Sequence, residues 1–329
     1  MNPYLGNSFQ LSGVERYRLE GGKAEGIEVL HAKNGNGIDL YLSLSRAGDI
    51  MALTYRGIML NYLTPNGYVH PSYYDPHGSG WIKAFAAGFL TTCGLENVGS
   101  PCQDKGEELP LHGSLSMIPV SSYSWEENEE EIILKTVLED EAIFSRKIER
   151  IRRIHLSKKS PEFTVVDSLE NRGGEAVDFE CLYHLNFGYP LLQETSEIYI
   201  ASEKVEARNA HAEEHLKEWK TITSPEPAYE ECCYYHTLKE GKAGLFNPDL
   251  GFGVSLSFDP KILDHFTEWK LLGVRDYVLG LEPGNCTPDG RDVNRKKGYL
   301  KCLLPGEKIT YSFLVGIVDE KKWKQFKGE

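Results

Sequence analysis

Short runs of alternating apolar and polar residues, separated by tight-turn residues, recur along this chain and constrain its fold more than any other feature. Residues 27–44 read as two strands joined by the turn Asn-Gly-Asn-Gly at 34–37. Residues 163–170 read as another strand, and we expect residues 176–185 to be its hairpin partner. Such a series of antiparallel strands favours a sandwich over a β–α alternation.

Most of the remaining sequence continues this pattern, with two exceptions. Residues 63–83 are rich in Pro, Gly, Tyr and His, which predicts an irregular segment that crosses the sheet or rims a cleft. Residues 202–221 are helix-prone and highly charged, which predicts one or two turns of surface helix. Because no repeat or linker interrupts the chain, we expect residues 1–329 to form a single domain. Further strands are predicted at residues 131–138, 147–156, 253–258, 277–282 and 309–318.

Charge and targeting signals narrow the partners and the compartment. The formal net charge is −13, from 36 Lys and Arg against 49 Asp and Glu, so we expect no nucleic acid. The densest basic stretch, residues 146–159, alternates with apolar residues and is expected to be a solvated strand face. The N-terminus resembles no secretion signal, and no apolar run approaches the roughly 20 residues that span a bilayer. The seven cysteines form no C-x-x-C pair. We therefore expect a cytoplasmic protein without membrane contact.

Three polar side chains far apart in the sequence are suited to proton transfer. His112, His184 and Glu282 each lie in or beside an apolar, strand-like run, where an ionisable group is costly unless it has a partner. Two imidazoles and a carboxylate supply a proton donor, a proton acceptor and a group that orients a substrate near neutral pH. The set needs neither a metal nor a cofactor, and it favours an acid–base enzyme.

Strand geometry places these groups on particular faces. Because side chains two apart on a strand share a face, His184 and Asn186 are predicted to face the same space, while Tyr183 and its alternate neighbours fill the core. Glu282 shares its face with Gly280, and the missing side chain there is expected to leave room for a ligand.

A different motif, H-x-x-E-H at residues 211–215, matches the signature of one class of zinc peptidase. That chemistry needs a long buried helix and a further acidic ligand downstream. The segment here is charged on all sides, which favours a surface helix without a metal.

At these polar segments the chain resembles the aldose 1-epimerase (galactose mutarotase-like) superfamily, and in particular a bacterial branch known largely by similarity. The blocks around His184 (residues 183–192) and Glu282 (residues 277–285) are the most specific. The resemblance implies an all-β, large antiparallel β-supersandwich with a few short surface helices and a sugar cleft on its concave face. Supporting landmarks lie at residues 45–50, 88–97, 111–113, 231–236 and 268–270.

The resemblance also implies a reaction, the interconversion of the anomers of a monosaccharide. Glu282 would take the proton from the anomeric hydroxyl, and His184 would protonate the ring oxygen, so that the pyranose opens, rotates and recloses. His112 would hydrogen-bond sugar hydroxyls or steady the ring-opened form. Four further residues are expected to contact the sugar through polar groups or an aromatic face: Arg46, Asn97, Asn186 and Trp269.

One departure bears on the substrate. Many relatives in this branch carry Arg directly after the His-Gly pair, whereas this chain has Ser114. The loss of that cation could change the preference for an anionic or branched sugar.

Two alternatives stay open at this level. A non-catalytic carbohydrate-binding or sensor protein could use the same scaffold, because a fold does not fix a function. The same acid–base pair could also serve a lyase or a hydrolase, since similar sandwiches host those reactions. The sequence does not specify the sugar or the oligomeric state.

Overall fold

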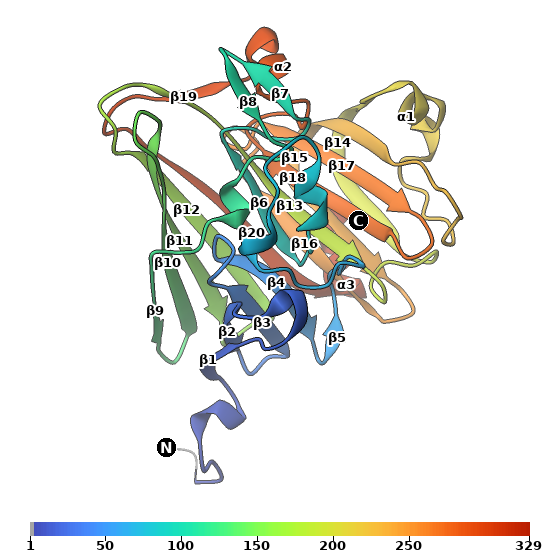
Figure 1. The fold of residues 1–329 in the computed structure, drawn as a ribbon. Helices are drawn as coiled ribbons and strands as arrows, with labels where there is room; N and C mark the ends of the chain where they lie inside the picture. The colour runs from blue at the N-terminus through green and yellow to red at the C-terminus, as the bar shows by residue number, and fades with distance from the viewer. Residues whose placement is uncertain (1–2) are drawn as a thin grey trace.

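Antiparallel pairing builds almost all of this molecule. The computed structural model describes residues 3–329, and Figure 1 shows the smaller sheet at the bottom of the view, beneath the strands of the large sheet. The smaller sheet has five strands in sequence order: β1 (Gly13–Arg18), β2 (Glu28–Lys33), β3 (Ile38–Ser43), β4 (Asp49–Tyr55) and β5 (Ile58–Met59).

The large sheet has 13 strands and carries the rest of the fold. Its hydrogen-bonded order is β19 (Lys301–Leu303), β13 (Val177–Gly188), β18 (Tyr277–Gly284), β17 (His265–Leu272), β15 (Cys232–Asn247), β16 (Phe252–Phe258), β20 (Lys308–Asp319), β12 (Glu162–Asn171), β11 (Lys147–Ser157), β10 (Glu131–Glu141) and β9 (Ser122–Glu127). Two more strands join from the side: β6 (Leu90–Leu95) pairs with β13, and β14 (Glu197–Ala207) pairs with β15. A small hairpin, β7 (Cys102–Asp104) and β8 (Glu107–Leu109), stands apart.

Helices are few and short. Within residues 3–329 they are α1 (Ala210–Glu214), α2 (Arg291–Lys297) and α3 (Glu320–Lys327), with six 3₁₀ turns, the first of them before β1. The longest described helix, α3, has 8 residues, and within residues 3–329 no helix is long and apolar enough to cross a membrane. The predicted all-β antiparallel architecture with short helices is confirmed.

The first predicted hairpin is also confirmed. Strands β2 and β3 pair antiparallel, with Lys33 opposite Asp39. The turn between them is built by Asn34, whose side-chain oxygen accepts hydrogen bonds from the backbone N–H groups of Asn36 (2.8 Å) and Ile38 (3.0 Å). An Asn that caps its own turn in this way favours the reversal of the chain.

The second predicted hairpin is wrong. Strand β12 pairs with β11 and β20, whereas β13 pairs with β6, β18 and β19, so the two strands are not hydrogen-bonded neighbours. The turn residue Asn171 donates its amide to the carbonyl oxygens of Glu175 (2.8 Å) and Leu303 (2.9 Å). These bonds tie the turn to the distant strand β19, so the chain crosses to another part of the sheet.

The charged segment 202–221 is only partly helical. Residues 202–207 continue strand β14, and the helix is limited to the five residues of α1 and a 3₁₀ turn at Leu216–Glu218. A β-bulge near Ser202 interrupts the pairing with β15. The helical propensity of this stretch was overridden where its backbone could pair with a long neighbouring strand.

The main hydrophobic core takes side chains from both sheets, and strand β13 contributes one face to it. Phe179, Cys181, Tyr183 and Leu185 are buried in that core, as the alternation predicts. The opposite face of the strand carries His184, which is therefore directed away from the main core.

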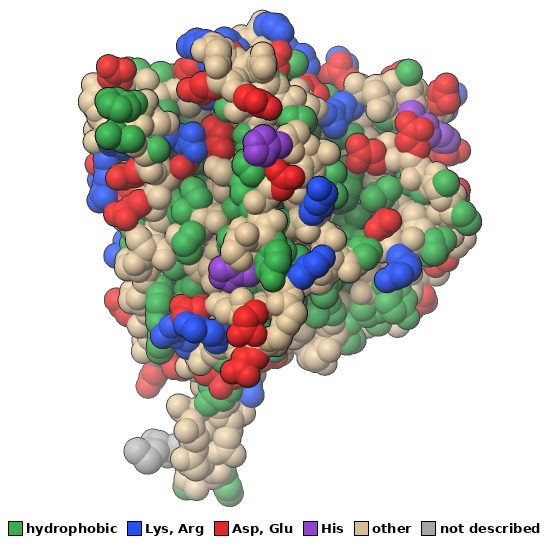
Figure 2. Space-filling model, viewed as in Figure 1, with side chains coloured by type: hydrophobic (Ala, Val, Ile, Leu, Met, Phe, Trp, Pro, Cys, Tyr) green, Lys and Arg blue, Asp and Glu red, His purple; other side chains and the backbone are tan. Residues whose placement is uncertain are grey.

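The basic strand β11 departs from its expected solvated face. Arg150 and Arg152 are buried in the core side of the strand, where Arg152 forms ion pairs with Asp167 (2.7 Å) and Asp49 (2.8 Å). Their buried neighbours Ile148 and Ile154 lie on the same face. On the outer face of the molecule in Figure 2, acidic and basic side chains are interspersed.

Candidate functional site

The two groups expected to transfer protons are brought into contact. His184 lies on β13 and Glu282 on β18, adjacent strands of the large sheet. The His184 Nε2 atom is 3.2 Å from Glu282 Oε1, and their side chains are 5% and 2% exposed. Both line one cavity of about 570 Å³. Sequence positions nearly 100 residues apart therefore meet at one cavity wall, as the reaction implied by the resemblance requires.

This pair keeps unused hydrogen-bonding capacity. His184 Nδ1 and Glu282 Oε1 are buried and have no hydrogen-bond partner, so the 3.2 Å contact is close without being a well-aligned hydrogen bond. Buried polar atoms are normally satisfied, and an exception calls for an explanation such as a catalytic role.

Burial also sets the charge of the pair. Loss of hydration raises the pKa of Glu282 well above its ordinary value of 4.5; the nearby Arg208 opposes this shift and Glu231 adds to it. Burial lowers the pKa of His184 well below 6.5, and His112 lowers it further. Burial therefore favours a protonated carboxyl beside a neutral imidazole, a pair that shares one transferable proton.

Gly280 does not leave the gap that we expected for a ligand. A side chain at this position would meet Glu282 Oε1 at 2.4 Å and Trp269 Cβ at 3.2 Å. The space over the glycine is thus taken by the carboxyl of Glu282, which folds back along its own strand face. The glycine makes room for the carboxyl and only indirectly for a substrate.

His112 enters the same cavity from the loop after β8. Its backbone has a positive φ of 55°, and it is held on both sides, because Gly94 N–H donates to His112 O (3.0 Å) and His112 N–H donates to Gly99 O (2.8 Å). The Gly99 N–H also donates to His112 Nδ1 (3.3 Å). Nδ1 is therefore the acceptor, and Nε2 carries the proton that a ligand can accept.

Burial and the guanidinium of Arg208 lower the pKa of His112, so its imidazole stays neutral at pH 7. The ring of His112 lies 5.8 Å from that of His184. The arrangement suits a neutral hydrogen-bond donor beside the acid–base pair.

Aromatic side chains form much of the remaining wall. The Trp269 ring lies edge-on to His184 at 5.3 Å, and the Trp269 indole N–H donates to Glu231 Oε2 (2.7 Å). The predicted rim segment 63–83 contributes Thr64, Pro65, Asn66, Trp81 and Ile82. Stacked against Trp81 at 4.4 Å is Phe85, which also lines the cavity. Such faces suit the apolar C–H surface of a sugar.

Three residues expected to contact a sugar do not line this cavity. Arg46 is buried and donates to the carbonyl oxygens of Val69 (2.8 Å) and Ala84 (2.7 Å), so it holds loop backbone instead. Asn97 is fully buried. Asn186, also buried, interacts with His184 and works against the fall of the His184 pKa. Arg46 and Asn97 thus bind backbone, whereas Asn186 donates its amide to His184 O (3.0 Å) and keeps an unpartnered Oδ1.

Ser114, the departure from the resembled branch, also lies outside the cavity lining. Its hydroxyl donates to Glu96 Oε1 (2.6 Å), and the other oxygen of Glu96 accepts from Arg146 (2.5 Å). Arg146, in the connection between β10 and β11, thus supplies the cation that pairs with Glu96 beside Ser114.

Sequence reasoning missed Arg208 and Glu231. Arg208 was hidden in a charged segment interpreted as surface, yet it lines the cavity and donates to Ser100 Oγ (2.9 Å) and to the carbonyl of Pro288 (2.9 Å). Glu231 lay within a resembled block but carried no signal of its own. The one signal for Arg208 was its position directly after the end of strand β14, where the chain leaves the sheet next to the cavity.

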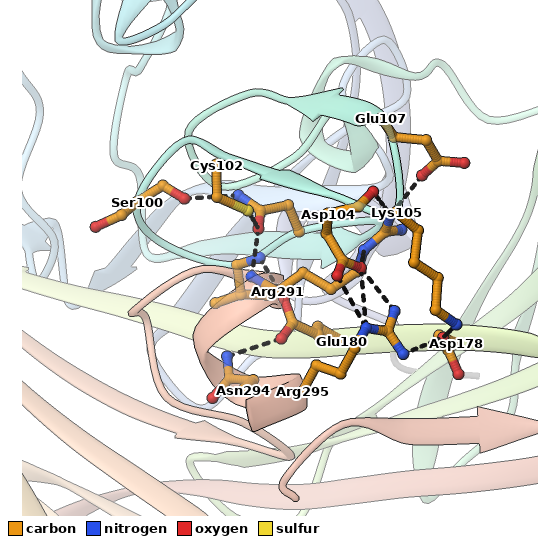
Figure 3. A network of polar contacts seen from close by, with 12 residues as sticks. Ser100, Cys102, Asp104, Lys105, Glu107, Asp178, Glu180, Arg291, Asn294 and Arg295 are labelled. Carbon is orange, nitrogen blue, oxygen red and sulfur yellow. Dashed lines mark hydrogen bonds and ion pairs between the residues drawn. The ribbon is translucent and has the colours of Figure 1, made fainter. Parts of the chain in front are cut away.

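A polar network holds the segment that leads to His112, and Figure 3 shows the part of it around Ser100, Glu180 and Arg291. Asn97 Oδ1 accepts from Arg291 N–H (2.8 Å), and Asn97 Nδ2 donates to the carbonyls of Ser100 (3.0 Å) and Pro110 (2.7 Å). Glu180 accepts from the backbone N–H of Val98 (2.8 Å). Burial raises the pKa of Glu180 to about 7. The loop from residue 97 to residue 112 is thereby anchored at both ends.

The H-x-x-E-H motif forms an exposed group outside the cavity. Ligand atoms of His211, Glu214 and His215 lie within 4.8 Å of one another, but α1 has only five residues, too short for the buried helix of a zinc peptidase. Tyr234 donates its hydroxyl to His215 O (3.2 Å). Tyr234 directly follows the cavity-lining Cys233 on β15, and successive strand residues point to opposite faces. The segment that Tyr234 contacts, α1 and His215, therefore lies on the face of β15 opposite the cavity. The predicted surface helix is confirmed.

Solved structures show the same architecture. A candidate aldose 1-epimerase from Klebsiella pneumoniae is 24% identical, with a TM-score of 0.90 over 96% of this chain and 86% of that one. A galactose mutarotase-like protein from Clostridium acetobutylicum is 12% identical, with a TM-score of 0.69 over 94% and 99% of the two chains. A galactose 1-epimerase from Lactobacillus acidophilus is 11% identical, with a TM-score of 0.63 over 94% and 99%.

At these identities the likeness establishes a shared galactose mutarotase-like fold. The curated proteins contain no significant match to this sequence. Residues 24–317 match the model of a family described as a domain of unknown function (DUF4432), and the chain therefore belongs to that family.

Proposed function

We propose that this protein is an isomerase that interconverts the anomers of a free sugar by acid–base ring opening and closure. The observation that carries the proposal is the His184–Glu282 pair, whose atoms lie 3.2 Å apart in a cavity with unpartnered polar atoms on both residues. The shared fold with epimerases and mutarotases supports it as an analogy.

The resting pair is one proton transfer away from the form that the reaction needs. Passage of the Glu282 proton to His184 Nε2 gives a carboxylate base and an imidazolium acid. The carboxylate then takes the proton of the anomeric hydroxyl while the imidazolium protonates the ring oxygen. The bond between the anomeric carbon and the ring oxygen breaks, and the anomeric carbonyl forms.

Ring opening returns the pair to its resting form, with the proton on Glu282 and a neutral His184. Rotation about the bond to the carbonyl carbon turns its other face toward the ring hydroxyl. Reclosure reverses both proton transfers and yields the other anomer. The number of protons on the pair is the same before and after, so the cycle consumes no co-reactant.

The remaining cavity groups would bind and orient the ring. His112 Nε2–H is a neutral donor for a hydroxyl or for the carbonyl of the open form, because its Nδ1 already accepts from Gly99. Trp269 offers an aromatic face, while Glu231 and Arg208 at the rim suit hydroxyl recognition. The proposed substrate is therefore a neutral sugar with a free anomeric centre.

Saturation-transfer NMR on a panel of free sugars tests the proposal directly, because it measures anomer exchange at equilibrium. The wild type should accelerate exchange for at least one sugar, and His184→Gln should abolish the acceleration. His155→Gln, at a half-buried histidine on strand β11, is the matched control and should leave the rate unchanged. Saturable sugar binding without faster exchange would instead indicate a binding or sensor protein. A product of changed mass would indicate a lyase or hydrolase.

A further inference from the structure

A second cavity adjoins the first. It has a volume of about 710 Å³, and Ser100 and Arg208 line both cavities. Its walls are polar and aromatic, unlike those of an apolar groove. They include Tyr235, Asp264, His265, Asp289, Lys297 and Tyr299.

The register of the sheet shows that the two cavities lie in line on one face. On β17, Trp269 and Leu271 line the first cavity, and His265 lines the second. On the neighbouring strand β15, Cys233 lines the first cavity and Tyr235 the second. All five are odd-numbered positions of regular strands that pair without a shift, so they share a face. The second cavity therefore continues the first along the same two strands.

The proposed reacting centre lies at the junction of the cavities. Glu282 pairs with Thr267, which stands between Trp269 and His265 on β17. The hydroxyl of Thr267 is buried and has no hydrogen-bond partner. Arg208 stands at the same boundary, with its guanidinium bonded to Ser100 and Pro288. A ring held at His184 and Glu282 would thus have open space on two sides.

The outer wall of the second cavity is firmly anchored. Helix α2 contributes Val293 and Lys297 to it. Behind this helix, Arg291 and Arg295 form ion pairs with Asp104 at 2.8 and 2.6 Å (Figure 3). These ion pairs hold the wall in place, and a rigid wall lowers the cost of ordering a bound group.

The charges around the second cavity are already matched. Asp289 pairs with Lys297 (3.0 Å) and with Arg208 (3.3 Å), and Asp264 pairs with Lys301 (2.5 Å). Neither of the cations on this wall, Arg208 and Lys297, is left without a carboxylate. Paired charges and tyrosine hydroxyls favour a neutral, hydroxyl-rich group over a phosphate.

We propose that the second cavity binds a further sugar unit of the substrate. The natural substrate would then be a neutral reducing disaccharide, with its reducing ring at His184 and Glu282 and its other ring in the second cavity. This inference rests on the proposed function for the catalytic step. Binding of a non-reacting unit can raise kcat/KM, because that energy can be used to orient the reacting ring.

Anomer exchange of monosaccharides and of reducing disaccharides with different linkages tests the inference. For the best linkage, kcat/KM should exceed that of the matching monosaccharide by about tenfold or more. Thr237→Trp fills the second cavity from an exposed wall position and should reduce this ratio to about one. Thr310→Trp, an exposed strand position elsewhere on the sheet, is the control and should preserve the ratio.

Equal kcat/KM for both classes of sugar, or a preference that survives Thr237→Trp, would overturn the inference. If no sugar is turned over, the proposed catalysis fails, and calorimetry decides on the cavity alone. Tighter binding of a disaccharide than of its monosaccharide, lost in Thr237→Trp, would then still support a second sugar site. Equal affinities would reject it.

Discussion

Two His–Glu pairs lie on opposite faces of the same sheet at the same separation. His184 Nε2 is 3.2 Å from Glu282 Oε1, and His236 Nε2 is 3.2 Å from Glu268 Oε2. Glu268 follows Thr267, the residue opposite Glu282, so the two carboxyls face away from each other. The pairs therefore share their chemistry, and only their surroundings differ.

Those surroundings are nearly opposite. His236 has both ring nitrogens engaged, because Ser202 lies 2.7 Å from its Nδ1, and its ring packs between Trp219 and Phe266. Glu268 keeps one free oxygen, but neither side chain is exposed at all. His236 borders the second cavity without exposing its side chain, whereas His184 has an unpartnered Nδ1 and a side chain that is 5% exposed beside the first cavity. A His–Glu contact is thus insufficient to mark a reactive site; side-chain access and an unpartnered imidazole nitrogen distinguish the first pair.

The largest expected difference between the pairs is in turnover. Glu282→Gln removes the transferable proton, so anomer exchange should fall by about 10²–10⁴-fold. Glu268→Gln should leave exchange within about threefold of wild type, because it lies behind the sheet from the cavity. NMR exchange rates on folded protein check both, and equal losses in the two variants would break the comparison.

The loss of folding stability should be larger in Glu268→Gln than in Glu282→Gln, the reverse of the order for turnover. Glu268→Gln disturbs the buried contact with His236, which in turn bonds the half-buried Ser202, at a cost of about 1–3 kcal/mol in the free energy of unfolding. Glu282→Gln should change that free energy by less than about 1 kcal/mol, since burial favours the uncharged carboxyl, which an amide resembles, and the group faces a cavity. Urea unfolding monitored by circular dichroism measures both values. A larger loss in Glu282→Gln would indicate a structural role for the first pair.

A smaller effect is expected at the cavity wall. Trp269→Ala removes an aromatic face, which should raise KM about tenfold while changing kcat less. Trp125→Ala, at a 42% exposed tryptophan on the edge strand β9, controls for loss of an indole. An unchanged KM in Trp269→Ala would remove this residue from the proposed sugar contacts.

The smallest effect is expected from pH. The active pair carries one proton; a second proton is added only below the lowered pKa of His184, and the single proton is lost only above the raised pKa of Glu282. Both shifts widen the one-proton range, so kcat should vary by less than about twofold from pH 6 to pH 8. Rates that decline steeply on either side of neutrality would show that the pair is less desolvated than its burial suggests.

Most strands could be predicted from the sequence, because alternation fixes which face a side chain takes, whereas the meeting of His184 with Glu282 was implied by the family resemblance. Which strands become hydrogen-bonded neighbours is harder to predict. The turn at Asn171 has hairpin residues, yet its amide bonds to distant backbone and sends the chain elsewhere. Long-range pairing depends on contacts that no local pattern records.

The failures among the site residues have a similar cause. Arg46 and Asn97 have the polarity expected of sugar contacts, but a buried carbonyl attracts such groups as strongly as a hydroxyl does. Arg208 was missed for the opposite reason, since charged neighbours gave it the appearance of surface. Polarity in a sequence indicates that a partner is needed, without showing whether that partner is protein or ligand.

The left-handed backbone at His112 restricts what can replace it. Few side chains other than glycine, asparagine and aspartate adopt a positive φ at low cost. Variation at this position would therefore draw on a short list of hydrogen-bonding groups, of which asparagine alone both tolerates the conformation and keeps a neutral donor. Substitutions that change the preferred sugar are easier at the rim, where residues 64–66 do not have a positive φ. Backbone stereochemistry therefore limits substitution at His112 on the inner wall, and changes of substrate preference are expected to arise from substitutions in the outer loop.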